Sequence, residues 1–83
     1  MLATGYRYIV KSPGVKGGDA IVEGTRIPVN TVMACVQRGD TPEDIVRNYP
    51  LLTRAQIFEC MAYYEDHKDE IDALIRINSD LLD

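Results

Sequence analysis

Hydrophobic residues in the second half of the chain recur at the spacing of an α-helix. The first set follows an i, i+3, i+4, i+7 pattern and consists of Val29, Val32, Met33 and Val36. This pattern places the four side chains on one face of a helix, with Asn30 as a suitable N-cap. Gly39 is the residue type that most often follows the end of a helix. The pattern therefore predicts a first helix that begins near residue 29 and stops at Gly39.

Signals at both ends predict a second, shorter helix. Thr41 is a suitable N-cap, Pro42 fits the first helical position, and the two acidic residues that follow suit the positive end of the helix dipole. Pro50 disfavours helical backbone at the residue before it. We therefore expect this helix to run from Pro42 to about Asn48.

The third helix has the clearest start, because Thr53 and Gln56 have the spacing of a capping box. Its apolar stripe consists of Ile57, Cys60, Met61, Tyr64, Ile71, Leu74 and Ile75. A continuous helix over residues 54–78 would be about 36 Å long at ~1.5 Å per residue, which is longer than so small a domain is wide. Its C-terminal half would then project from the domain. A break near residues 67–69, which would give two packed helices, is the alternative.

The projecting half is the predicted surface for a protein partner, because exposed apolar patches usually mark such surfaces. Its apolar residues are Ile71, Leu74, Ile75, Leu81 and Leu82. The net charge of the chain is −4, but residues 1–58 carry seven basic and five acidic side chains, and residues 59–83 carry two basic and eight acidic ones. This asymmetry indicates two faces with different partners. A solvated acidic helix that only keeps the protein soluble is the alternative.

The first third of the chain has the pattern of short β-strands. Tyr6–Val10 and Ala20–Val22 are rich in β-branched, aromatic and other apolar residues, and Glu23-Gly24 can form a turn that returns the chain into a strand at Thr25–Ile27. Pro28 ends this hairpin because it has no backbone N–H to donate. Two or three short strands are not stable alone, so we expect a helix or a second subunit to cover them. A homodimer or higher homo-oligomer is therefore expected.

Together these elements predict one α+β domain, mostly α, over residues 1–83. A short N-terminal β-strand and a β-hairpin occupy residues 6–28, and a three-helix, helix-turn-helix-like bundle occupies residues 29–66. Residues 67–83 form an acidic amphipathic C-terminal helix or tail, as the end of a long C-terminal helix. The chain has no apolar run long enough to cross a bilayer and no secretory signal at Met1–Thr4, so we expect a cytoplasmic protein without membrane contact. Cys35 and Cys60 are expected to be buried thiols.

The predicted helix-turn-helix points to DNA. In this motif the second helix presents its first turns to the major groove, and here that helix opens with Arg54 and Gln56, which can pair with guanine and adenine edges. Arg47 and Arg26 are candidate phosphate contacts, and for Arg26 the alternative is an ion pair that anchors the corner at Gly24–Val29. Arg and Gln are also common at exposed helix starts because both favour helix formation, and Gln56 can be occupied by its capping box.

The sequence does not indicate catalysis, a metal or a cofactor. His67 is the only histidine and lies among charged residues on a helix face that we expect to be solvated. No serine or cysteine is spaced to pair with it as a nucleophile. The glycines of the N-terminal third precede a strand, whereas phosphate-binding motifs require a helix after them. We therefore expect a protein that is not an enzyme and that uses no cofactor.

An ordered series of short motifs resembles the prokaryotic domain-of-unknown-function family 433. The motifs are Pro13-Gly14-Val15, Gly18, Gly24–Val29, Gly39, Pro42, Glu43, Ile45, Tyr49-Pro50, Leu52-Thr53, Ile57 and Ala62-Tyr63-Tyr64. The resemblance covers about residues 6 to 75. Asp19-Ala20 stands where a basic residue and proline are more usual.

The resemblance implies a dimeric antitoxin similar to those of the VapB kind, encoded beside a PIN-like ribonuclease toxin. Such a protein would neutralise the toxin with its acidic C-terminal segment and would bind its own operator DNA. The alternative is an oligomeric protein-interaction module that does not bind DNA.

Overall fold

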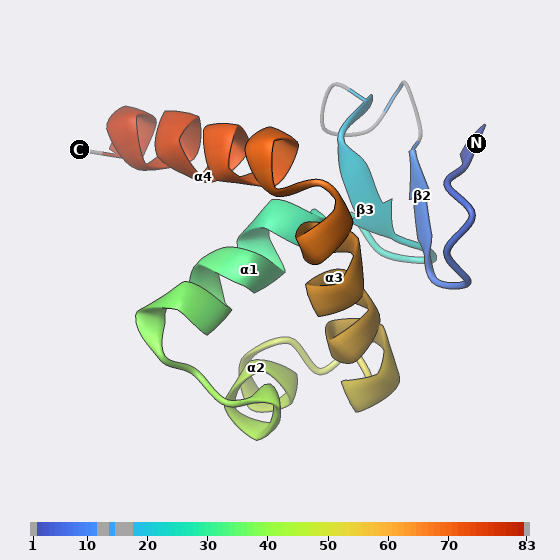
Figure 1. Cartoon of the computed structure of the whole chain (residues 1–83). Helices are drawn as coiled ribbons and strands as arrows, with labels where there is room; N and C mark the ends of the chain where they lie inside the picture. Colours follow the sequence, from blue (N-terminus) through green and yellow to red (C-terminus); the bar gives the residue numbers. More distant parts are fainter. Residues whose placement is uncertain (1, 12–13, 15–17, 83) are drawn as a thin grey trace.

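Within residues 2–11, 14 and 18–82, which a computed structural model describes, the chain forms three strands followed by four helices (Figure 1). Side chains are described for residues 4–11, 14 and 18–78. This arrangement confirms the predicted α+β class with mostly helical content. The motif residues Pro13 and Val15 lie outside the described residues.

The three strands pair in one antiparallel sheet in the order β1-β2-β3. The strands are β1 (Leu2–Ala3), β2 (Ile9–Lys11) and β3 (Ala20–Val22). Ile9 lies opposite Val22. The first predicted strand therefore begins later than expected, at Ile9 instead of Tyr6, and it pairs directly with the strand predicted at Ala20–Val22.

The predicted hairpin partner of β3 is wrong, because residues 25–27 form no strand. An isolated bridge joins Ile21 to Pro28, and the Val22 backbone N–H donates to the Ile27 carbonyl at 3.0 Å. The hydroxyl of Thr25 donates to the Val22 carbonyl at 2.8 Å, and the Thr25 backbone N–H donates to the same carbonyl at 3.1 Å. These local bonds close a tight turn, so β2 rather than residues 25–27 supplies the ladder for β3.

Helix α1 spans Val29–Arg38 and ends where the sequence predicts, since Gly39 follows it with φ of +104°. Its N-cap is Pro28, in an extended conformation and without a side-chain cap. Asn30, the expected N-cap, is instead the second residue of the helix and is 3% exposed. Because Pro28 already stops the extended segment, the helix begins two residues earlier than an Asn30 cap allows.

Helices α2 (Pro42–Asn48) and α3 (Arg54–Asp66) both begin with the expected caps. The Thr53 hydroxyl accepts from the Gln56 backbone N–H at 3.2 Å, and the Gln56 side chain accepts from the Thr53 backbone N–H at 2.9 Å. Thr41 caps α2 in the same reciprocal way. The two boxes satisfy N–H groups that a helix start would otherwise leave unpaired.

A continuous C-terminal helix is wrong, because the chain breaks at His67 and continues as α4 (Lys68–Leu82). Helix α4 packs against α1 and lies above it in Figure 1, with α2 below. Its Ile71 is 0% exposed. A straight helix would leave Ile71 in water. The break interrupts the helical hydrogen bonds at His67, but burial of the large apolar side chain of Ile71 compensates for this loss.

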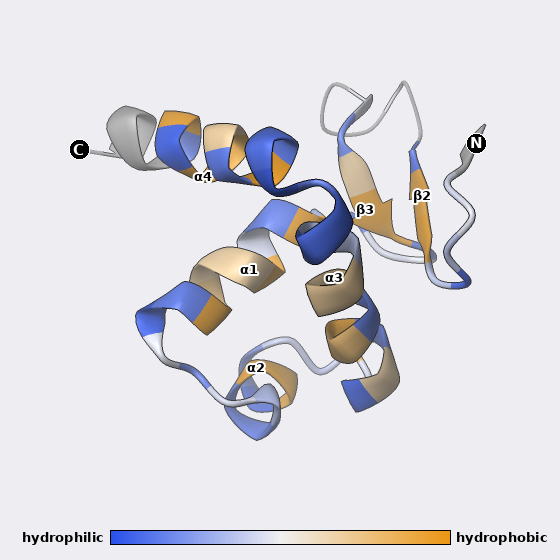
Figure 2. Ribbon diagram, viewed as in Figure 1, coloured by the Kyte–Doolittle hydropathy of each residue, from blue (hydrophilic) through white to orange (hydrophobic). Residues whose placement is uncertain are grey.

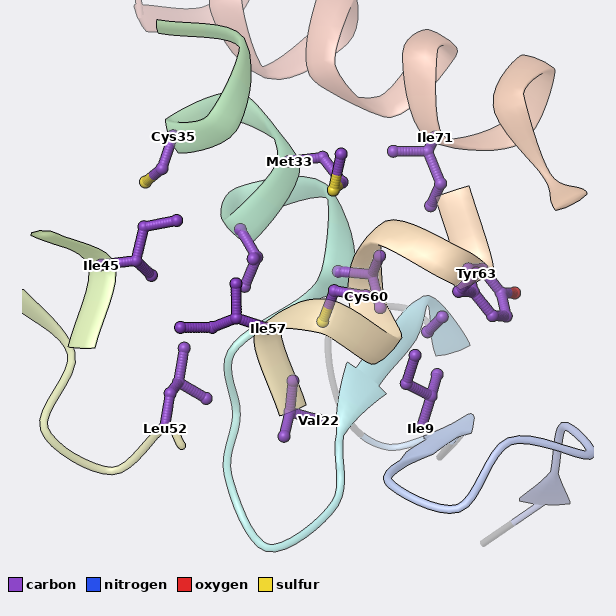
Figure 3. Close-up of a cluster of buried hydrophobic side chains, with 13 residues drawn as sticks. Ile9, Val22, Met33, Cys35, Ile45, Leu52, Ile57, Cys60, Tyr63 and Ile71 are labelled. Carbon is purple, nitrogen blue, oxygen red and sulfur yellow. The ribbon is translucent and has the colours of Figure 1, made fainter. Parts of the chain in front are cut away.

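The hydrophobic core lies between the sheet and the helices. It consists of Ile9, Ala20, Val22, Val29, Val32, Met33, Cys35, Ile45, Leu52, Ile57, Cys60, Tyr63 and Ile71. Figure 3 shows Ile71 reaching from α4 toward α1 and α3, and Figure 2 shows hydrophobic residues along β2 and β3 and in bands on the helices. Each helix therefore contributes to one core.

Both cysteines are buried and free, as expected. Burial raises the pKa of the Cys60 thiol to about 12. Among the helices that the structure describes, none has the length and apolar character needed to cross a bilayer.

Candidate nucleic-acid interface

Helices α2 and α3 pack against each other and are joined by residues 49–53 (Figure 1). Leu52 fixes this connection to the core, because its side chain is only 2% exposed. Its backbone N–H also donates to the Tyr49 carbonyl at 2.9 Å. Leu51 lies on the outer side and is 72% exposed. The pair has the outline of a helix-turn-helix, with a connection slightly longer than the three or four residues typical of that motif.

The exposed residues of α3 are mostly apolar up to its last turn. Ile57, Cys60 and Tyr63 face the core, and Glu65 and Asp66 are exposed at the C-terminal end of the helix. The exposed residues that precede them are Arg54, Ala55, Phe58 and Ala62. We call these four residues the α3 outer face. Phe58 is 48% exposed. A solvent-facing helix surface normally carries charged and polar residues, so this composition is unusual for a surface without a partner.

Sequence reasoning selected Arg54 on this face but missed Phe58. The signal was present in the sequence: residues 51, 55, 58 and 62 are apolar and repeat at helical spacing on the side opposite the buried stripe.

Arg54 is held only loosely. Its Nε lies 3.2 Å from an oxygen of Glu43 on α2, with side-chain exposures of 62% and 55%. Its guanidinium also lies over the Phe58 ring, 5.6 Å from the centroid. An exposed ion pair of this kind contributes at most about 1 kcal/mol, so Arg54 can exchange Glu43 for another acceptor at little cost.

Gln56 is half-buried, and its side-chain oxygen accepts from the Thr53 backbone. The capping box that the sequence indicates is thus formed, and this oxygen serves the start of α3. An adenine contact needs both the oxygen and the amide N–H groups of a glutamine. Gln56 therefore has a structural task that competes with reading a base.

Arg47 and Arg26 are exposed and lie on different parts of the fold. Arg47 is on α2 and pairs with Asp44 at 3.2 Å. Hydrogen bonds from the backbone and side chain of Thr41, with the nearby Arg47, hold the pKa of the Asp44 carboxyl below its usual value. Arg26 lies on the turn between β3 and α1. The structure therefore brings Arg47 and Arg54 to the two paired helices, and Arg26 to the end of the sheet.

The predicted partner surface on α4 is partly wrong. Ile71 belongs to the core and is not available to a partner. Leu74 and Ile75 are half-buried, and Ile75 packs against the core. The side chains of Leu81 and Leu82 lie outside the described residues. Ile77, which was not selected from the sequence, is 53% exposed.

Acidic residues of α4 serve the fold as well as the surface. The Asp72 carboxylate accepts from the Tyr64 hydroxyl at 2.9 Å and from the Gln37 amide at 3.3 Å. Glu70 accepts from the Tyr63 hydroxyl at 3.2 Å and lies 3.6 Å from the Lys11 ammonium. These bonds attach α4 to α1, α3 and β2, so its charge is not only a solubility feature.

The expectation that His67 is solvated is wrong. It is half-buried at the end of α3, with Nδ1 3.0 Å from the Tyr63 carbonyl oxygen and its ring stacked on Tyr63. Within the described residues, no three side chains of His, Cys, Asp or Glu gather in a way that would hold a metal.

Comparison with known proteins agrees with this fold. The chain is 34% identical over 64 residues to "Uncharacterized protein y4eO" of Sinorhizobium fredii, a match that covers 77% of this chain and 29% of that protein. The chain thus spans less than a third of the length of this relative. A crystal structure of a DUF433 member from Anabaena variabilis superposes with a TM-score of 0.79 at 39% identity, covering 83% of this chain and 68% of that one. Because residues 9–64 also match the model of the family described as protein of unknown function DUF433, the chain belongs to that family.

Proposed function

We propose that the protein is the antitoxin-like component of a type II toxin-antitoxin module in the cytoplasm. In this proposal a dimer binds its own operator DNA through α3 and neutralises a PIN-like ribonuclease toxin through α4. The role is one of binding, without turnover. The observation that carries the DNA half is the α3 outer face, which is exposed, mostly apolar and headed by a weakly held arginine.

The chemistry of the α3 outer face suits the major groove. Small side chains such as Ala55 and Ala62 let a helix approach the base edges closely, and Ala and Phe side chains make apolar contacts with the thymine methyl group. In this proposal Arg54 pairs with guanine O6 and N7. Compared with the sequence-based hypothesis, Phe58 is added to the residues proposed to contact bases. Gln56 is no longer assigned a base contact, because its side chain caps α3.

Phosphate contacts are assigned to Arg47 and Arg26. Because the chain is acidic overall, three arginines per subunit supply limited attraction to DNA. A dimer doubles these contacts and places two recognition helices on successive half-sites. A dimer is therefore part of the proposal.

The toxin half rests on charge complementarity. A ribonuclease must attract a polyanionic substrate and so needs a basic surface, whereas residues 59–83 carry two basic and eight acidic side chains. Ile77 supplies an exposed apolar anchor on the same helix. We assign toxin contact to Leu74, Ile77 and the end of α4 that contains Leu81 and Leu82, and no longer to Ile71.

The DNA proposal is tested by fluorescence anisotropy with a duplex taken from upstream of the gene. We expect affinity to fall steeply with salt and Arg54→Ala to weaken binding about tenfold. Arg76→Ala is the matched control, because it removes the same charge from an exposed position on α4. Absence of binding at low salt would leave the alternative, an interaction module that does not bind DNA.

The toxin proposal is tested by co-purification with the product of the adjacent reading frame. Ile77→Asp combined with truncation after Asn78 leaves Ile71 in the core and should abolish both capture and neutralisation. Phe58→Asp is the matched control, since it changes an apolar residue of similar exposure on α3. If the truncated Ile77→Asp chain still neutralises the toxin, α4 is not the toxin-binding element.

A further inference from the structure

The first turns of α2 and α3 bring an acidic and a basic side chain together. Glu43 is the second residue of α2, Arg54 is the first residue of α3, and the two helices pack against each other (Figure 1). Arg54 Nε lies 3.2 Å from Glu43 Oε1, and the guanidinium also lies over the Phe58 ring, 5.6 Å from its centroid. Arg54 therefore has one contact on each of the two helices before any ligand binds.

The two acidic residues in the first turn of α2 have different tasks. Asp44 completes the capping box with Thr41 and pairs with Arg47. Glu43 takes no part in that box, and its ion pair within the described residues is the one with Arg54. A carboxylate at this position also suits the positive end of the helix dipole. That role would affect the stability of α2 but not the choice of a base, so an experiment can separate the two roles.

The contact with Glu43 leaves Arg54 able to bind a base. A guanidinium carries five N–H groups, and only one of them is on Nε. A bidentate contact with guanine needs two N–H groups, which the terminal nitrogens can supply. The Nε side of Arg54 can therefore stay on Glu43 while the terminal nitrogens turn toward O6 and N7.

The negative charge of Glu43 affects phosphate binding more than base binding. Phosphates are charged, and non-specific affinity for DNA comes from the positive charges of Lys and Arg. Guanine O6 and N7 are uncharged acceptors. A carboxylate 3.2 Å from the guanidinium offsets its charge and repels nearby phosphates, but leaves most of its donors free. Glu43 should therefore weaken non-specific binding more than specific binding.

We propose that Glu43 is a positioning residue for Arg54: it holds the guanidinium beside Phe58 and favours guanine over phosphate as the partner of Arg54. This inference rests on the proposed operator binding. It assigns part of the sequence specificity to a side chain that itself contacts no base.

The positioning is tested first without DNA. Full-length protein is labelled with 15N, and the heteronuclear NOE of the Arg54 Nε–H group reports how restricted the guanidinium is. We expect Glu43→Ala to lower this NOE. Glu65→Ala is the matched control, because Glu65 lies at the other end of α3 and forms an exposed ion pair with Lys68, also at 3.2 Å. An Arg54 NOE that is the same in wild type and Glu43→Ala would overturn the proposal.

The effect on specificity is then measured by fluorescence anisotropy with the upstream duplex and a scrambled duplex of the same length. We expect Glu43→Ala to bind the scrambled duplex about fivefold more tightly, which corresponds to about 1 kcal/mol, the upper limit for an exposed ion pair. Affinity for the upstream duplex should change less, so the ratio of the two affinities should fall. The salt dependence with the scrambled duplex should steepen by about one phosphate contact. Glu65→Ala should leave the ratio unchanged.

A double-mutant cycle with Arg54→Ala determines whether Glu43 acts through Arg54. In the Arg54→Ala background, Glu43→Ala should leave the ratio nearly unchanged. An equal fall in both backgrounds would contradict the positioning role, because it would reflect general repulsion of phosphates. If the wild-type protein binds no DNA at low salt, the proposed function fails and this inference fails with it. If the wild type prefers the upstream duplex and Glu43→Ala keeps the full preference, only this inference fails.

Discussion

The ring of His67 stacks on the ring of Tyr63, with centroids 4.0 Å apart and planes inclined by 15°. His67 lies at the break between α3 and α4, and Tyr6 adds an edge contact to Tyr63 at 5.1 Å. The hydroxyl of Tyr6 also donates to Asp66 at the end of α3. This aromatic cluster joins the N-terminal segment to the point where the helix turns, and so fixes the direction of α4.

His67→Ala should lower the free energy of unfolding by about 1–2 kcal/mol, because it removes the stacked ring and the Nδ1 contact with the Tyr63 carbonyl. Urea denaturation measures the change. Lys68→Ala is the control, since it removes an exposed pair with Glu65, worth at most about 0.5 kcal/mol, and a distant contact of the ammonium with the Tyr64 ring at 6.0 Å. Equal stability of the two variants would show that the stack does not hold the break.

Ile71→Ala should lower the free energy of unfolding by about 2–5 kcal/mol, because the Ile71 side chain is fully buried between α4 and the core. This is a large share of the stability of a domain this small. Ile77→Ala, six residues further along the same helix, should change stability by less than about 0.5 kcal/mol. Thermal and urea unfolding compare the two. A small effect at Ile71 would mean that α4 is not packed on the core in solution.

Gln56→Ala and Arg54→Ala should separate the cap from the DNA contact. Loss of the Gln56 side chain opens one half of the capping box and should cost roughly 0.5–1 kcal/mol of stability. Arg54→Ala should leave stability nearly unchanged, since its ion pair is exposed, and should reduce affinity for DNA. Unfolding curves and anisotropy titrations are run on both proteins. If Gln56→Ala instead weakened DNA binding without loss of stability, Gln56 would contact a base and would not act mainly as a cap.

Stability should fall at alkaline pH. Burial, helped by Glu70, raises the pKa of Tyr63 from 10.0 to about 12, and burial raises that of Cys60 from 9.0 to about 12. Both groups hold their protons more tightly in the folded protein, so their contribution is complete below pH 9 and is lost as the pH rises toward 12.

The loss should be on the order of 3 kcal/mol between pH 8 and pH 11. It is measured by urea unfolding at several pH values, with Cys60→Ala as the comparison. That variant is less stable at neutral pH but should lose less stability with rising pH. An identical slope in both proteins would contradict the contribution of Cys60.

Asn30→Leu should stabilise the protein by about 1 kcal/mol or more, because it replaces an unpaired buried acceptor with an apolar side chain of similar size and with better helix propensity. Differential scanning calorimetry measures the gain. A loss of stability would indicate that Asn30 is already satisfied in solution.

Helix starts and stops could be predicted from the sequence because their causes are local. Thr41 and Thr53 bond to residues three positions away, and Gly39 adopts the left-handed conformation that ends α1. The exception, Asn30, was misassigned as a cap because Pro28 ends the preceding segment without any side-chain bond. For the candidate interface, the same local reasoning found Arg54 and the competing task of Gln56, but not the exposure of Phe58.

Local patterns in the chain were therefore enough for the family, the class of fold, the N-caps at Thr41 and Thr53, the capping box at Thr53 and the helix-turn-helix outline, since each depends on residues within a few positions of one another. Contacts between distant residues decided the rest. The pairing of β3 with β2, the turn at His67 and the burial of Ile71 all depend on which apolar surfaces meet when the elements pack.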